Sequence, residues 1–308
     1  MIEVENLKKY FSSGMLRKRY VKAVDDVSFH IEKGETLGLV GESGCGKTTI
    51  GKAILKLIKP TSGRVIFDGV DLLKLKKKKL RRLRPRMQMI FQDPDSSLDP
   101  RMKIGDSIAE PLKLQGDINK GEIKGKILEL VETVGLNPEH VNRYPYQLSG
   151  GQNQRVVLAR ILALNPDFII ADEPTSSLDV SVQAQILNMM NDLKREIHLT
   201  LLFISHDLEV VRCMSDRIAV MYQGKIVEIG KTEDIFDYAK HPYTNTLISP
   251  TSIGDRVILD RDMKNASDYT LGCVFYQRCP FAVERCSKKE PEMIEIGKKH
   301  YVLCDRVT

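Results

Sequence analysis

The stretch that decides the fold is Gly41-Glu-Ser-Gly-Cys-Gly-Lys47-Thr48, which matches the phosphate-binding pattern G-x-x-x-x-G-K-[ST]. Its glycines let successive backbone N–H groups turn inward and wrap phosphates. A strand-like run over 36–40 precedes the loop and a helical run over 49–57 follows it, so the positive end of the helix dipole faces the anion. Lys47 is expected to neutralise the β- and γ-phosphates of ATP, and Thr48 to ligate Mg²⁺. The residues expected to contact the nucleotide here are Gly41, Ser43, Gly44, Cys45, Gly46, Lys47, Thr48 and Thr49.

A second segment, Phe168-Ile-Ile-Ala-Asp172-Glu173, is a buried-type apolar strand that ends in two carboxylates. Asp172 is placed to hold Mg²⁺ directly or through water. Glu173 is placed to polarise the attacking water as a general base. A strand end before a turn at Pro174 is common by itself, and it is the phosphate loop upstream that gives these carboxylates a catalytic interpretation.

The chain has 308 residues, which predicts one large core plus an appendage, since domains run to roughly 100–200 residues. Short strand-like segments over 1–40 lead into the loop, and strand-like runs alternate with helical ones over 41–235, which predicts an α/β core. The pattern is helical without a clear strand over about 105–165, which indicates an inserted helical subdomain. The amino-acid composition changes after residue 240, where a polar, Ser/Asp-rich stretch precedes a cluster of cysteines. We therefore expect a domain over 1–240 and a small Cys-rich domain over 241–308.

Composition is ordinary for a globular protein, with 42% hydrophobic and 29% charged residues. No apolar run approaches the roughly 18–20 residues that span a bilayer, and the N-terminus lacks a signal-peptide core, so a cytosolic chain is expected. Much of the net charge of +6 comes from Lys74 to Arg86. Leucines at 72, 75, 80 and 83 predict an amphipathic helix there with a solvated basic face; contact with nucleic acid or anionic lipid is the alternative.

The segment Leu148-Ser149-Gly150-Gly151-Gln152 precedes a helical run over 153–164 and makes a second anion-binding surface. It resembles the signature sequence of ABC ATPases. The resemblance implies a P-loop NTPase core of ABC type and a head-to-tail dimer, in which Ser149, Gly151 and Gln152 contact the ATP bound by the partner. Asn153 departs from the family, where a larger residue such as Arg or Gln is usual, and little effect is expected.

Three further motifs follow the same family in order. Gln92, in Phe-Gln92-Asp-Pro, resembles the Q-loop glutamine, which implies contact with Mg²⁺ and the γ-phosphate and a relay to membrane subunits. Ser177-Leu-Asp179 resembles the D-loop, where Asp179 contacts the opposite subunit. His206, in Ser205-His206-Asp207, resembles the switch histidine on the γ-phosphate. The resemblance thus implies the catalytic residues Glu173, His206 and Gln92, and the Mg²⁺ ligands Thr48, Gln92 and Asp172.

The aromatic side chain that stacks on adenine is less clearly marked. Alignment by Asn6-Leu-Lys-Lys favours Phe11. Tyr10 and Tyr20 remain open, because the segment between them and the phosphate loop is longer than is usual in the family.

The chain has six cysteines, of which Cys45 and Cys213 are isolated and are interpreted as small packing residues. The other four follow the spacing C-x5-C-x6-C-x17-C, and a cytosolic cluster of this kind favours a metal site over disulfides. Four thiolates suit a [4Fe–4S] cluster or Zn²⁺. The four residues are Cys273, Cys279, Cys286 and Cys304.

Three segments resemble the ATPases of oligopeptide and dipeptide importers. They are the sequence around these cysteines, His241-Pro-Tyr243-Thr244 and residues 91–102. The [4Fe–4S] cluster is favoured, with zinc as the first alternative and unligated thiols as the second. The resemblance implies an ATP-hydrolysing subunit at the cytoplasmic face of the membrane, peripheral to it. The implied partners are a second ATPase, homologous or identical, two transmembrane permease subunits and an extracytoplasmic substrate-binding protein, with no nucleic acid.

Three other functions fit parts of the sequence. One is a non-catalytic interaction or redox-sensing protein built around the cysteine cluster, and the intact Glu173 and His206 argue against it. An importer of nickel or another small solute uses close relatives of the same ATPase. A soluble ABC ATPase acting on DNA or ribosomes usually carries two cassettes or a long coiled coil. Only about a hundred residues separate Thr48 from Leu148, and no heptad run lies between them. The peptide importer is therefore favoured.

Overall fold

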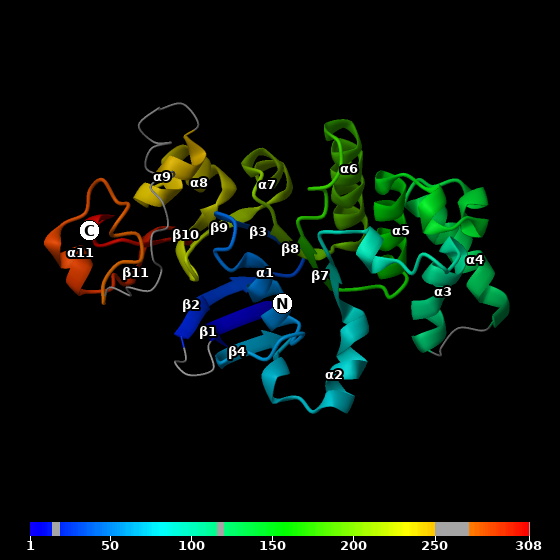
Figure 1. Ribbon diagram of the computed structural model, residues 1–308, viewed down its shortest axis with the longest axis horizontal. Helices are drawn as coiled ribbons and strands as arrows, with labels where there is room; N and C mark the ends of the chain where they lie inside the picture. Colours follow the sequence, from blue (N-terminus) through cyan, green and yellow to red (C-terminus); the bar gives the residue numbers. More distant parts are fainter. Residues whose placement is uncertain (14–18, 116–119, 250–270, 308) are drawn as a thin grey trace. The chain divides into compact units, whose positions relative to one another are not determined.

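The computed structural model describes residues 1–13, 19–115, 120–249 and 271–307 (Figure 1). The chain forms two compact units. The first contains residues 1–31, 36–73 and 204–308, and the second contains residues 32–35 and 74–203. The polar stretch before the cysteines lies largely outside the described residues. The domain limits expected from sequence stay a prediction.

An antiparallel sheet of four strands opens the first unit, in the order β2-β1-β4-β5. Ile2 pairs with Ile31 and Val4 with Phe29, and all four side chains are buried, so alternate positions of two neighbouring strands face one core. The expectation of short strands here was wrong, because the pairing continues through the polar residues between these apolar ones. The strands are β1 Ile2–Ser13, β2 Arg19–Ile31, β4 Ser62–Phe67 and β5 Val70–Asp71.

The first unit also contains the strands β11-β12-β10-β9-β3, in this order, of an eight-stranded sheet. Its strands β3 and β9 are parallel and buried at every residue, as expected for apolar runs covered on both faces. The C-terminal segment adds β12 antiparallel to β10, and β11 antiparallel to β12. The strands are β3 Thr36–Val40, β9 Arg217–Tyr222, β10 Lys225–Lys231, β11 Met293–Gly297 and β12 His300–Leu303.

Helices of the first unit pack on these strands, with α7 against β3 and α8 against β10 (Figure 1). The helix after the phosphate loop begins at Lys47 and ends at Ile54, earlier than the sequence pattern predicted, because the loop turns directly into it at Gly46. The helices are α1 Lys47–Ile54, α7 Leu208–Met214, α8 Thr232–Tyr238, α9 Pro242–Ile248 and α11 Glu284–Lys288, with the 3₁₀ turns η1 Leu72–Lys74 and η6 Asp305–Val307.

The second unit has strands in the order β8-β7-β6, and helices follow one another along the chain between β6 and β7. No strand occurs among the described residues between 91 and 167, which agrees with the helical pattern of the sequence. The strands are β6 Met87–Ile90, β7 Phe168–Asp172 and β8 Thr200–Ile204. The helices are α2 Lys77–Leu83, α3 Ile104–Gln115, α4 Lys120–Thr133, α5 Gly150–Leu162 and α6 Val180–Ile197, with the 3₁₀ turns η2 Arg84–Arg86, η3 Asp95–Ser97, η4 Pro138–Asn142 and η5 Pro145–Gln147.

The basic stretch from Lys74 to Arg86 is not the single helix that its leucine spacing predicted. It divides into the end of η1, the seven-residue α2 and the turn η2, which holds Pro85. Proline lacks the N–H that a continuing helix needs, so α2 cannot extend. Leu72 and Leu80 are buried and the lysines at 76–79 are exposed, which agrees with a solvated basic face.

Candidate functional site

The phosphate loop follows β3 and is shaped by glycines at positive φ. Gly41 has φ 150° and Gly46 has φ 115°. A Cβ on Gly41 would lie 2.1 Å from the Met221 carbonyl oxygen, and a Cβ on Gly46 would lie 2.0 Å from the Ala23 carbonyl oxygen. Because both neighbours are backbone atoms of β9 and β2, only glycine lets the loop lie against these strands.

Lys47 is buried inside the curve of the loop. Its Nζ donates to the carbonyl oxygens of Gly41 at 2.7 Å and of Glu42 at 2.9 Å. The ammonium is thus held by the loop in which it is expected to meet phosphate. Ser43, Gly44 and Thr48 are exposed on the same loop, so their groups are accessible to a ligand.

The two isolated cysteines differ in their surroundings. Cys45 is buried in the loop, where burial raises the pKa of its thiol against the opposing charge of Lys47, and this agrees with a packing role. Cys213 is exposed, so its interpretation as a packing residue was wrong. On α7 the buried positions are Val210, Val211 and Met214, and position 213 lies outside that stripe.

Gln92 and Glu173 meet at the carboxyl edge of two parallel strands in the second unit. Ile90 of β6 pairs with Ala171 of β7, so the residues two further on, Gln92 and Glu173, leave the sheet together. The Gln92 Nε2 donates to the Glu173 Oε2 at 2.9 Å. Asp172 is buried at the end of β7. Sequence reasoning named all three residues but missed this bond, because the register that pairs β6 with β7 cannot be read from either strand's own sequence.

Glu173 adopts a left-handed backbone conformation, with φ 49°. For a residue with a side chain this conformation costs about 1–3 kcal/mol and is often retained at functional sites. Ser176 supports the turn, because its N–H donates to the Glu173 carbonyl at 3.3 Å and its hydroxyl does so at 3.2 Å. The turn aims the carboxylate at Gln92.

The signature segment forms the first turn of α5, which begins at Gly150. The sequence pattern had predicted that the helix begins after the segment, at residue 153. Ser149 is the N-cap of α5: its Oγ accepts from the Gln152 N–H at 3.3 Å, and the Gln152 Oε1 accepts from the Ser149 N–H at 3.0 Å. This reciprocal capping box places the amides of Gly150 and Gly151 in the first turn. The positive end of the helix dipole favours an anion there.

The signature segment packs against the D-loop segment within the second unit. A Cβ on Gly151 would lie 2.3 Å from the Val182 Cγ1, so a larger residue would push α5 away from α6. Asp179 is the N-cap of α6, and its Oδ1 accepts from the Val182 N–H at 3.0 Å. Val182, which sequence reasoning missed, therefore joins the two motifs.

Asn153 has a structural role that its sequence position did not reveal. Its side chain is buried, and its Nδ2 donates to the Pro145 carbonyl at 3.2 Å. This bond holds η5 against α5. A larger residue at this position would have to leave the buried space.

His206 belongs to the first unit, is exposed and follows the end of β8 by two residues. The Ser205 N–H donates to the Leu39 carbonyl of β3 at 3.4 Å, so His206 leaves the sheet at the edge where β3 enters the phosphate loop. Asp207 caps α7 by accepting from the Glu209 N–H at 3.0 Å. The contact of His206 with the γ-phosphate stays a prediction.

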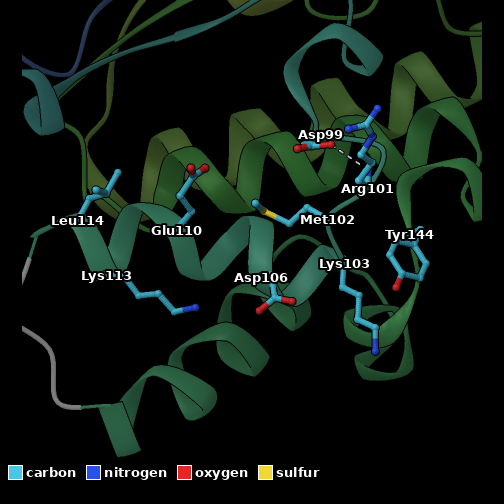
Figure 2. A pocket seen from close by; sticks show the side chains of 9 residues that line it. All are labelled: Asp99, Arg101, Met102, Lys103, Asp106, Glu110, Lys113, Leu114 and Tyr144. Carbon is cyan, nitrogen blue, oxygen red and sulfur yellow. Dashed lines mark hydrogen bonds between the residues drawn. The ribbon is translucent and has the colours of Figure 1, made fainter.

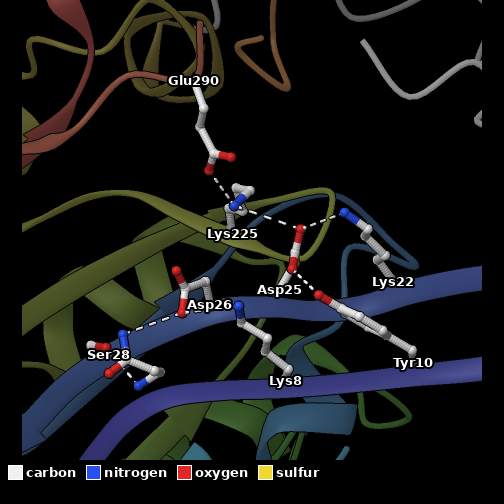
Figure 3. Close-up of polar contacts among 9 residues, drawn as sticks. Lys8, Tyr10, Lys22, Asp25, Asp26, Ser28, Lys225 and Glu290 are labelled. Atoms are coloured by element: carbon white, nitrogen blue, oxygen red, sulfur yellow. Dashed lines mark hydrogen bonds and ion pairs between the residues drawn. The ribbon is translucent and has the colours of Figure 1, made fainter. Parts of the chain in front are cut away.

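The three candidate aromatic residues for adenine lie on the β1–β2 ribbon. Tyr10 donates its hydroxyl to the Asp25 carboxylate (Figure 3). Phe11 is 44% exposed and Tyr20 is 54% exposed. Phe11 pairs with Val21 and Ser12 with Tyr20, so Phe11 and Tyr20 face opposite sides of the ribbon. Phe11 as the stacking residue stays a prediction.

Asp25 gathers polar partners around its carboxylate (Figure 3). Burial acts to raise its pKa, but the Tyr10 hydrogen bond and the charges of Lys225 and Lys22 outweigh burial and lower the pKa below its usual value. The side chain is therefore ionised and ties the ribbon to β10 through Lys225, at 3.6 Å.

The four C-terminal cysteines all line one small cavity in the first unit. Burial, helped by the neighbouring thiols, raises the pKa of Cys273 to about 11. In the part of the chain that the structure describes, no three His, Cys, Asp or Glu side chains are gathered closely enough to hold a metal ion. The metal site stays a prediction.

Comparison with known proteins decides the family. Residues 24–176 match the family model described as ABC transporter, and residues 227–286 match the one described as oligopeptide/dipeptide transporter, C-terminal region. The oligopeptide transport ATP-binding protein AppF of Bacillus subtilis is 45% identical, over 99% of this chain and 96% of its own length. The chain is an ATP-binding subunit of the oligopeptide/dipeptide ABC transporter family. A Brucella ovis protein, provisionally named a peptide import ATP-binding protein, is 46% identical over 99% of this ABC subunit and 98% of its own length.

Solved structures share the ABC fold of this subunit. A dimeric structure of the bacterial ABC transporter cassette MJ0796 is 31% identical, with a TM-score of 0.69 over 75% of this chain and 99% of that one. CbiO1 from Clostridium perfringens, part of an ABC transporter complex, is 24% identical with a TM-score of 0.68, which supports the fold. No helix in the described residues of the ABC subunit is long and apolar enough to cross a membrane.

Proposed function

We propose that this ABC subunit binds ATP with Mg²⁺ and hydrolyses it to power the import of di- or oligopeptides. The observation that carries the proposal is the full-length likeness to AppF, an oligopeptide transport protein by name, which includes the C-terminal region as well as the cassette. The Gln92–Glu173 pair beside Asp172 supports hydrolysis in addition to binding.

The proposed catalytic groups are Glu173, His206 and Gln92. Glu173 takes the proton of the attacking water, and His206 contacts the γ-phosphate. The Gln92 amide nitrogen bonds Glu173, which leaves its amide oxygen as the atom that can face a cation. Hydroxyl, amide and carboxylate oxygens are the hard ligands that Mg²⁺ prefers, so Thr48, Gln92 and Asp172 fit the ion. When bound, the ion neutralises charge on the phosphates.

The subunit is proposed to act as one half of a head-to-tail dimer. Ser149, Gly151 and Gln152 of one subunit would close on the ATP held by the phosphate loop of the other, with Asp179 across the same interface. The capped first turn of α5 supports this role, because the amides of Gly150 and Gly151 lie there at the positive end of the helix dipole, which favours an anion. The solved structure of MJ0796 with ADP and Pi is dimeric. The partner is a homologous ATPase or a second copy of this chain.

We also propose that the four C-terminal cysteines hold a [4Fe–4S] cluster, with Zn²⁺ as the alternative, in a small domain over 241–308 that follows a nucleotide-binding domain over 1–240. The four thiols line a single cavity, and soft thiolates are the ligands that both centres bind. Because no three of the described side chains lie close enough to hold an ion, the cysteines would have to close in on the metal when it binds. The role expected for the centre is structural.

Protein purified without oxygen is expected to contain iron and sulfide and to absorb broadly in the visible range. Cys286→Ser should remove that absorption and lower thermal stability, whereas the exposed Cys213→Ser should change neither. Metal analysis and an absorption spectrum give the answer. One equivalent of zinc without iron would select the alternative, and protein with neither metal would reject the site.

A groove on the second unit is proposed to receive the membrane subunits (Figure 2). Asp106, Glu110 and Lys113 project from one face of α3 at helical spacing, and Leu114 is 73% exposed beside them. Arg160 of α5 bonds Glu110 and donates to the Ser97 carbonyl at 2.7 Å, which fixes this end of the groove. Mixed charges around exposed apolar groups suit a short cytoplasmic helix of a permease. The lining residues are Asp99, Arg101, Met102, Lys103, Asp106, Glu110, Lys113, Leu114 and Tyr144.

Leu114→Glu is expected to lower peptide uptake by about tenfold, because one buried charge or lost apolar contact costs on the order of 1–3 kcal/mol. The ATPase rate of the isolated subunit should stay unchanged. Tyr238→Glu, at an exposed aromatic on α8, is the matched control and should leave uptake intact. Equal uptake in the two variants would place the permease contact elsewhere.

The transport function itself is tested by reconstitution. The subunit, located at the cytoplasmic face of the membrane, is combined with its permease subunits, its extracytoplasmic binding protein and its partner ATPase in sealed vesicles. ATP-dependent uptake of a labelled dipeptide or oligopeptide supports the proposal. Uptake of Ni²⁺ or another solute in place of peptide selects the alternative importer. No association with permeases would favour a soluble ABC ATPase.

A further inference from the structure

Glu42, the second residue of the phosphate loop, is held through all three of its polar groups. Its N–H donates to the Tyr243 hydroxyl at 3.0 Å. Its carbonyl accepts from the Lys47 Nζ at 2.9 Å. Its carboxylate accepts two bonds from the Arg278 guanidinium, at 2.8 and 2.9 Å. The residue that supports the phosphate-binding lysine is therefore itself positioned by α9 and by the cysteine segment, residues 271–307.

Arg278 reaches the loop from a rigid setting. Its side chain is buried, and it also donates to the Tyr222 hydroxyl at 3.2 Å. Tyr222, Tyr243 and Phe275 pack together, with ring centroids 4.7 to 5.5 Å apart, and all three are almost wholly buried. A two-bond guanidinium–carboxylate pair in such surroundings fixes orientation as well as distance.

The same short turn carries Arg278 and two of the cavity cysteines. The Cys279 N–H donates to the Phe275 carbonyl at 2.9 Å, and the Cys273 N–H donates to the Cys286 carbonyl at 2.8 Å. Phe275 lines the cysteine cavity on one side and touches Tyr222 on the other. Because Arg278 belongs to this turn, a change in the turn's conformation is expected to shift the guanidinium that holds Glu42.

A second link joins the cysteine segment to the β1–β2 ribbon (Figure 3). Glu290 pairs with the buried Lys225 of β10, Lys225 lies 3.6 Å from Asp25, and Tyr10 bonds Asp25. The segment thus contacts both the loop expected to bind phosphate and the ribbon expected to hold adenine. A C-terminal domain with no role in ATP binding would not need contacts with both the phosphate loop and the β1–β2 ribbon.

We propose that Arg278 is a positioning residue for ATP: through Glu42 it sets the phosphate loop around Lys47, so that order in the cysteine segment and affinity for ATP depend on each other. The inference rests on the proposed ATP site. Coupling of this kind is reciprocal, so ATP must stabilise the cysteine turn to the same extent that the turn strengthens ATP binding.

The first test measures the dissociation constant of a fluorescent ATP analogue with Mg²⁺ on the full-length subunit. Arg278→Gln is expected to raise it about tenfold, the usual effect of losing charged hydrogen bonds. Arg278→Lys should recover part of the loss, since it keeps the charge without the paired geometry. Glu42→Gln should match Arg278→Gln, and the double variant should be no worse than either single one. Arg285→Gln, in the same segment but paired with Asp305 at 2.9 Å, is the control and should bind as the unaltered subunit does.

The second test needs no substitution. Backbone hydrogen exchange over 273–286 in the unaltered subunit should slow when the ATP analogue binds. Unchanged exchange there, or equal dissociation constants for Arg278→Gln and Arg285→Gln, would overturn the inference while the ATP site stands. No binding by the unaltered subunit would instead overturn the proposed ATP site.

Discussion

Glu173→Gln is expected to abolish turnover while leaving ATP binding in place. A glutamine amide cannot accept the proton of the attacking water, and loss of a general base lowers rates by roughly 10²–10⁴-fold. The amide has the size of the carboxylate and its oxygen can still accept from the Gln92 Nε2, which is 2.9 Å from Glu173 in the structure. The ATP dissociation constant should therefore change by less than about threefold. Phosphate release and equilibrium binding measure the two quantities.

The matched control for this variant is Glu139→Gln, the same substitution at an exposed carboxylate of η4. Its turnover should equal that of the unaltered subunit. If Glu173→Gln also hydrolysed ATP at the unaltered rate, another group would have to be the base.

Gly46→Ala is expected to destroy the phosphate site. The new methyl group would start 2.0 Å from the Ala23 carbonyl oxygen, a backbone atom of β2 that no side-chain rotation can move. The φ of 115° at Gly46 is also one that L residues rarely adopt. Because Gly46 is the N-cap of α1, the displacement moves the amides of the first turn away from the phosphates. We expect ATP affinity to fall by about a hundredfold or more.

The control separates steric clash from backbone strain. Gly69 also has positive φ, at 77°, but a Cβ there meets nothing within 4 Å. Gly69→Ala should lower stability by about 1 kcal/mol and leave the ATP dissociation constant unchanged. Thermal unfolding and nucleotide titration distinguish the two variants. Normal ATP affinity in Gly46→Ala would show that the loop can bind phosphate in another conformation.

Local sequence patterns predicted the elements that depend on neighbouring residues. The strands at 36–40 and 168–172 were placed correctly, because an apolar run followed by a loop is sufficient to define them. The same reasoning erred where a local signal was misleading. Leucine spacing predicted a single helix over the basic stretch, but that helix ends before the turn that holds Pro85. Cys213 was predicted to pack in a core, but its side chain is exposed on α7.

By itself, the sequence determined the family and marked the candidate sites: the phosphate loop, the paired carboxylates and the signature are short motifs of residues adjacent in the chain. The four cysteines are spread over 273–304, and the metal proposed for them stays a prediction. Tertiary structure decided which of these groups meet. Gln92 and Glu173 are 81 positions apart and meet through the register of two parallel strands. Glu42 and Arg278 are 236 positions apart and meet because aromatic packing brings the cysteine segment to the loop. Such contacts are set by packing energies summed over many residues, which no local pattern records.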